Sequence, residues 1–93
     1  MYITLDNLRD ALSKDDLSYI NDKLAPLKEV AIASLLPTTG LKNEDGAVKE
    51  GSPLDKLTDQ YIIEYCRAAL DGVNNERMQF ALLNQIQALL EIT

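Results

Sequence analysis

The stretch Ser52–Gly72, SPLDKLTDQYIIEYCRAALDG, decides the fold of this 93-residue chain. Ser52 is typical of the residue that caps a helix, Pro53 of the first helical position and Asp55 of the third. Gly72 is typical of the residue that follows a helix. Between these ends, apolar side chains recur at helical spacing, with Leu54, Leu57, Tyr61, Tyr65 and Ala68 along one face and Ile62, Cys66 and Ala69 widening it. The stretch therefore predicts a long amphipathic helix that ends near Asp71.

Residues 76–92 predict another long helix, capped by Asn74 or Asn75. The stripe expected to face the core consists of Met78, Leu82, Ile86 and Leu89, with Phe80, Leu83 and Leu90 beside it. From Met78 to Thr93 the only charged residue is Glu91. On the opposite face, solvated helices usually carry Lys and Glu. This helix carries amide side chains there instead: Gln79, Asn84, Gln85 and Gln87.

This shortage of charge leaves two interpretations of the last helix open. Either it lies at the centre of a small bundle, or it contacts a second copy or a partner, because interface cores are depleted in charge and enriched in aromatic residues and Met. Residues 30–41 are also uncharged, and two nearly uncharged helices exceed what one small core can bury. We therefore expect self-association, with Gln79, Phe80, Leu83 and Gln87 as the candidate interface residues.

Shorter helices are expected near the start of the chain. Thr4 can cap a helix over residues 5–12. Ser13, followed by Asp16, resembles a capping box and begins a second helix that carries Leu17, Ile20 and Leu24.

A third helix is expected after Pro26, which suits the first helical position, although the second helix could also run into it with a kink. Residues 27–36, LKEVAIASLL, carry apolar groups on every side after Glu29, which is typical of a central, buried helix. Pro37 is expected to end this helix, since proline cannot donate a backbone hydrogen bond.

A long loop, residues 37–52, is expected between the third and fourth helices. It holds three of the four glycines, and Asp45-Gly46 is a strong turn signal. Leu41–Asn43 and Ala47–Lys49 could pair as a short β-hairpin, and a disordered excursion is the alternative. Because long loops in compact domains are often functional, we name a candidate docking loop: Asn43, Glu44, Asp45, Gly46 and Lys49.

The same region contains Leu36-Pro37-Thr38-Thr39-Gly40, which matches the L-P-x-T-G pattern that sortases cut. A sortase substrate also needs a membrane span and a basic tail after the motif, and here charged loop residues follow. The amino terminus, MYITLD, lacks the basic and apolar regions of a signal peptide. We interpret the match as coincidence. The sequence thus predicts an all-α single domain over residues 1–93, a small bundle of about five helices with one long loop.

The composition excludes several functions. The net charge is −6 and is spread evenly along the chain. Residues 1–51 hold 9 acidic and 6 basic side chains, and residues 52–93 hold 6 acidic and 3 basic ones. A chain without a basic patch is not expected to bind nucleic acid sequence-specifically or to bind an anionic membrane. The chain has no His and a single Cys, Cys66, which we expect to be a packing residue.

No catalytic, metal-binding or cofactor-binding site is predicted. General acid–base chemistry usually needs a group that titrates near neutral pH, most often His. Residues 41–52 resemble a calcium loop in Gly46, at its sixth position, but Leu41 and Ser52 replace the acidic first and last ligands. We therefore expect no enzyme activity and no cofactor.

The layout of the chain resembles the head–tail connector (adaptor) proteins of tailed bacteriophages. The resemblance rests on the order of helices: MYITLDNLRDAL, the acidic start SKDDLSYI, a central small-residue helix, a loop, SPLDKLTDQYIIEYCRAAL, the break DGVNN and ERMQFALLNQIQALL. Its motifs are Pro53-Leu54, Tyr61 with Tyr65, and leucines near the end at Leu82, Leu83 and Leu89.

The resemblance implies a virion protein, assembled in the cytoplasm of a bacterial host, that forms a ring around the channel through which DNA passes. The portal or a tail-completion protein would be its partner. The alternative is a small acidic helical interaction or inhibitor module, monomeric or dimeric, cytoplasmic and without catalytic activity. The two differ in the molecular mass that each predicts in solution.

Overall fold

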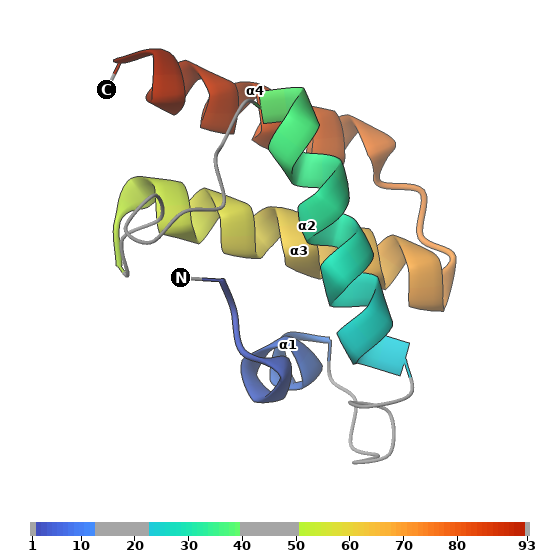
Figure 1. Cartoon of the computed structure of the whole chain (residues 1–93). Helices are drawn as coiled ribbons and strands as arrows, with labels where there is room; N and C mark the ends of the chain where they lie inside the picture. Colours follow the sequence, from blue (N-terminus) through green and yellow to red (C-terminus); the bar gives the residue numbers. More distant parts are fainter. Residues whose placement is uncertain (1, 13–22, 40–50, 93) are drawn as a thin grey trace.

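The computed structural model describes residues 2–12, 23–39 and 51–92, and these residues form four α-helices. The helices are α1 (Leu5–Ala11), α2 (Ala25–Thr39), α3 (Pro53–Asp71) and α4 (Glu76–Ile92). α3 and α4 lie side by side and run antiparallel, α2 crosses the pair, and α1 lies against α3 on the side away from α4 (Figure 1). The all-α prediction is confirmed for the described part of the chain.

The two ends of α3 form as the sequence predicts. The Asp55 backbone N–H donates to the Ser52 hydroxyl at 3.1 Å, and the Asp55 carboxylate accepts from the Gly51 N–H at 3.0 Å. Helix ends leave backbone donors without intrahelical partners, and the bond from the Asp55 N–H satisfies one of them, while the bond from Gly51 fixes the chain just before the cap. At the other end Gly72 adopts φ 68°, where its N–H reaches the Ala68 carbonyl at 3.1 Å. Residues with a Cβ rarely adopt this left-handed conformation.

The core lies where α2 crosses the α3–α4 pair. Its buried apolar side chains come from all four helices or the residues next to them: Leu8, Leu12, Leu24, Ala31, Leu35, Tyr61, Ile62, Cys66, Leu82, Leu83 and Ile86. α1 contributes through Leu8, and its start is capped by Thr4, whose hydroxyl accepts from the Asn7 N–H at 3.2 Å. Burial of these side chains is the main stabilising term of such a domain.

The prediction of about five helices with a β-hairpin is wrong. Four helices are present in the described residues, and none of those residues lies in a strand. The expected second helix falls on residues 13–22 and the hairpin on residues 41–49, both outside the described part. Helical winding is already present at Lys23 and Leu24 as a wider π turn, and Pro26 is the second residue of α2. Pro26 therefore does not begin a separate helix, because proline is tolerated throughout a first turn.

α2 also differs from prediction at its other end and on one face. It continues through Pro37 to Thr39, so the connection to α3 begins later than residue 37. Proline in the last turn removes a single hydrogen bond, to Ala33, and both residues are exposed, so water can reach the carbonyl. The expected burial on all sides is not observed, since Val30 is 50% exposed while Ala31 and Leu35 are buried.

Candidate interaction surface

Helix α4 exposes a broad surface that carries no charge. We call this the uncharged face of α4 and define it by its exposed residues, Met78, Phe80, Ala81, Asn84, Gln85, Gln87 and Ala88. Phe80 is 62% exposed and Met78 is 49% exposed, which is unusual for side chains of their size. Glu76 and Arg77 precede the uncharged face and Glu91 follows it.

The four candidate interface residues from the sequence do not share one environment. Phe80 and Gln87 lie on the uncharged face. Gln79 is half-buried and donates from its side-chain nitrogen to the Asn75 side-chain oxygen at 2.7 Å. Leu83 is only 8% exposed and belongs to the core. The buried arc of α4 reaches Leu83 because α2 packs against α4 in addition to α3.

The expected core stripe of α4 is likewise shifted around the helix. Leu82 and Ile86 are buried and Leu89 is half-buried, as the spacing predicts, but Met78 is exposed. The sequence predicted Met78 in the core stripe and Leu83 at the interface, the reverse of what is observed, because both fit an apolar stripe of period 3.6. The packing of α4 against α2 and α3 covers Leu83 and leaves Met78 exposed.

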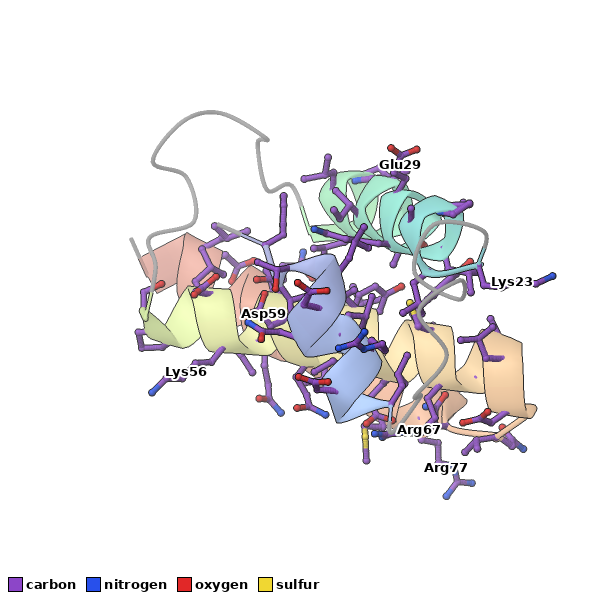
Figure 2. All side chains as sticks on the ribbon, turned by 90° about the horizontal axis from the view of Figure 1, so that it is seen from below. Lys23, Glu29, Lys56, Asp59, Arg67 and Arg77 are labelled. Atoms are coloured by element: carbon purple, nitrogen blue, oxygen red, sulfur yellow. The ribbon has the colours of Figure 1, made fainter. Side chains whose placement is uncertain are left out.

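A groove adjoins the uncharged face at the end of α4. Its volume is about 510 Å³, and its lining residues are Pro53, Lys56, Leu57, Gln85, Ala88 and Leu89. The groove forms because the antiparallel arrangement brings the start of α3 beside the end of α4 (Figure 1). Most of the lining is apolar, and Lys56 is the one charged residue among the described residues that line it. Figure 2 shows the Lys56 side chain pointing away from the helices into solvent.

A buried carboxylate positions the start of α4. Glu64 is 4% exposed and accepts hydrogen bonds from the Gln60 amide at 3.0 Å, from the Asn75 amide at 2.8 Å and from Arg67. Asn75 also donates to the Glu64 backbone carbonyl at 2.9 Å. A buried carboxylate is costly unless such donors surround it. Because Asn75 immediately precedes α4 and bonds to Gln79 within it, the network ties the first turn of α4 to α3.

The same network extends to α1. Arg67 donates to the Ala11 carbonyl at 3.4 Å, at the end of α1. Figure 2 shows Arg67 beside the last turn of that helix. Glu64 therefore connects α3 to α4 through hydrogen bonds from Asn75, and to α1 through its ion pair with Arg67. The sequence did not indicate this role, since Glu64 has no feature there that distinguishes it from other polar residues of the helix.

A second carboxylate of α3 holds the segment before α1. The Ile3 N–H donates to Asp59 at 2.8 Å. Partial burial and the nearby negative charge of Asp55 raise the pKa of Asp59 to about 6, whereas the Ile3 hydrogen bond and Lys28 act in the opposite direction. Asp59 thus has less compensation for its burial than Glu64.

The described residues include one cysteine, Cys66, which is buried. Burial raises the pKa of the Cys66 thiol to about 11, so it is neutral at physiological pH. Within residues 2–12, 23–39 and 51–92, no group of three acidic or Cys side chains could hold a metal ion. The same residues contain no helix with the length and apolar character needed to cross a membrane. The candidate docking loop, Asn43–Lys49, lies outside the described residues.

Comparison with known proteins adds no relative. No protein-family model, no curated protein and no solved structure matches this chain. The uncharged face and the groove are therefore interpreted from their own geometry and charge.

Proposed function

We propose that this protein acts by contact rather than catalysis, as a subunit that assembles with further copies of itself through the uncharged face of α4. The observation that carries the proposal is the exposure of Phe80 and Met78 on a helix face that has no charge from Met78 to Leu90. Exposed apolar surface of this kind often marks a protein–protein contact.

The charge of the chain supports the choice of this face. Each copy carries −6, so two copies repel each other wherever their acidic residues meet. A face without charge is the part of the surface where approach costs the least. Two copies that meet there also leave no ionised side chain buried without a partner.

The biological role that we propose is that of a head–tail connector subunit in a tailed bacteriophage. This part rests on the resemblance of the helix order and of the Pro53-Leu54 and Tyr61–Tyr65 motifs. An acidic wall suits a channel for DNA, because it does not attract the phosphate backbone. In this role the chain would form a ring and contact the portal or a tail-completion protein, with the candidate docking loop at that second contact.

The proposal is tested by measuring mass against protein concentration with multi-angle light scattering. We expect the wild type to exceed the monomer mass as concentration rises and to reach a fixed number of copies, as a closed ring does. Asn84→Glu adds one negative charge at the centre of the uncharged face and should shift assembly to higher concentration by at least tenfold. Val73→Glu adds the same charge at an exposed position between α3 and α4 and serves as the matched control.

Two results would contradict the proposal in different ways. A wild type that remains monomeric at all concentrations would exclude self-association and favour the small acidic interaction module. If Asn84→Glu assembles as readily as Val73→Glu, self-association uses a surface other than the uncharged face of α4.

A further inference from the structure

We infer that Phe80 of one copy inserts into the groove between α3 and α4 of the next copy, so that the copies join head to tail. This inference rests on the proposed function, because it names the contact through which self-association occurs. The side chain that inserts and the groove that receives it both lie in the described residues.

Phe80 cannot fill the groove of its own chain. It lies in the second turn of α4, whereas the groove is lined by Gln85, Ala88 and Leu89 near the other end. At about 1.5 Å per residue, Phe80 and Ala88 are separated by about 12 Å along the helix. At about 100° per residue, Ala88 lies about 80°, Gln85 about 140° and Leu89 about 180° around the helix from Phe80. Phe80 therefore does not reach the groove of its own chain.

The groove suits an aromatic side chain. Its volume of about 510 Å³ accommodates a phenyl ring, and Pro53, Leu57, Ala88 and Leu89 supply apolar contacts. An aromatic side chain buries roughly 150–250 Å² when it is covered. Lys56 at the groove can lie against the ring face, where its charge is attracted by the aromatic quadrupole.

One pair of charges beside the two features, Glu76 and Lys56, is of opposite sign. Glu76 is exposed one turn before Phe80, at the i−4 position, and therefore projects on the same side of α4. When Phe80 enters the groove of a neighbour, Glu76 comes close to Lys56 of that neighbour. Arg77 lies on the other flank of Phe80, and Figure 2 shows Arg77 and Lys56 at opposite ends of the α3–α4 pair.

The separation of the two features determines the symmetry of the assembly. Phe80 and the groove are separated by about 12 Å along α4 and by about 80–180° around it. In the arrangement that we infer, each copy therefore contacts two neighbours, one through each feature. Contacts of this head-to-tail kind close into a ring or continue as a chain. Since one inserted ring covers less than the ~800 Å² per partner of a stable interface, the single contact is weak and closure strengthens it.

The test uses two variants that each remove one half of the contact. Phe80→Asp removes the inserted side chain, and Ala88→Arg fills the groove and repels Lys56. Both positions are exposed, so circular dichroism and thermal unfolding should match the wild type. Val73→Asp and Ala33→Arg are matched controls, because they make the same kinds of change at exposed positions outside the contact. We expect each contact variant alone to need at least tenfold more protein to assemble, and the controls to behave as the wild type.

Mixing the two variants decides the arrangement. Phe80→Asp retains an intact groove and Ala88→Arg retains an intact Phe80, so an equimolar mixture should form a 1:1 complex and stop there. Association of Phe80→Asp at wild-type concentrations would overturn the inference, and the Asn84→Glu variant would then decide separately whether the uncharged face of α4 still makes the contact. A mixture that stays monomeric would also overturn it, since the two residues would then belong to one shared surface. A monomeric wild type would remove the proposed function and the inference together.

A charge exchange provides a second readout on the same contact. Lys56→Glu should weaken assembly, because the new carboxylate repels Glu76 of the neighbour. Adding Glu76→Lys in the same chain should restore most of the loss. If the double variant is as weak as Lys56→Glu alone, Glu76 and Lys56 do not meet and the proposed orientation of the copies is wrong.

Discussion

Phe80 and Leu83 lie three residues apart on α4, yet their environments are opposite. Phe80 is 62% exposed, whereas Leu83 is 8% exposed and packs in the core. Both are large and apolar, and both belong to a helix nearly free of charge. The difference teaches that the width of the buried side of a helix depends on how many neighbouring helices pack against it. α4 contacts both α2 and α3, so its buried side is wide enough to include Leu83.

The largest expected effect is a difference in stability between a charge placed on the buried side of α4 and a charge placed on its exposed side. Leu83→Lys should destabilise the fold by about 3–5 kcal/mol, because it buries an ammonium group without a partner and loses apolar packing. Phe80→Lys should change the free energy of unfolding by less than about 0.5 kcal/mol, as exposed substitutions usually do. Urea denaturation of the two variants measures this difference. Equal stabilities would show that α2 does not cover Leu83.

A smaller effect is expected at the network that positions the start of α4. Glu64→Ala should cost about 2–3 kcal/mol, because Asn75 and the partly exposed Arg67 lose their common acceptor. Glu29→Ala removes an exposed carboxylate from α2 and should be nearly neutral. Thermal unfolding followed by circular dichroism compares the variants. If Glu64→Ala is as stable as the control, the orientation of α4, and with it the exposure of Phe80, is set by apolar packing alone.

The smallest effect concerns pH and Asp59. Its pKa is about 6 in the folded protein and about 3.8 when unfolded, so the folded state binds the proton more tightly. The resulting stabilisation is complete below the unfolded pKa and is lost as the pH rises through about 6. Asp59→Asn removes this dependence and should be more stable than the wild type at pH 7.5 by about 1 kcal/mol or less, since solvent screens the site.

Denaturation of both proteins at pH 4 and pH 7.5 tests the role of Asp59, because other carboxylates contribute equally to each. The advantage of Asp59→Asn should vanish at pH 4. An advantage that is the same at both pH values would mean that burial does not penalise the Asp59 charge. The anchoring of the N-terminal segment to α3 through Ile3 would then resemble the well-compensated site at Glu64.

The residues that cap helices allowed the ends of those helices to be predicted from the sequence. Ser52, Asp55 and Gly72 mark the two ends of α3, and the hydrogen bonds there join residues at most four positions apart. Thr4 likewise predicted α1. Pro26 and Pro37 misled the assignment of helix boundaries, because proline weakens a helix by an amount that depends on its place: it is tolerated in the first turn and costs one hydrogen bond in the last.

The candidate surface was predictable only in part. The absence of charge after Met78 is a property of the sequence and pointed to α4. Which residues of α4 are exposed was not predictable from the sequence. Of the four candidate interface residues, Gln79 is half-buried and Leu83 is buried. The groove could not be foreseen, since Leu57 and Leu89 are far apart in the chain and meet only through the antiparallel pairing of α3 and α4.

By itself, then, the sequence determined an acidic, all-α chain with a long capped helix from Pro53 to Asp71 and a last helix depleted in charge. These features follow from side-chain type and from interactions within about one helical turn. The tertiary structure alone decided that Leu83 is core and Phe80 is surface, that Glu64 is buried and shared among three elements, and that a groove opens beside Lys56. Burial is a relation between segments distant in the chain, and no local pattern records which segments will meet.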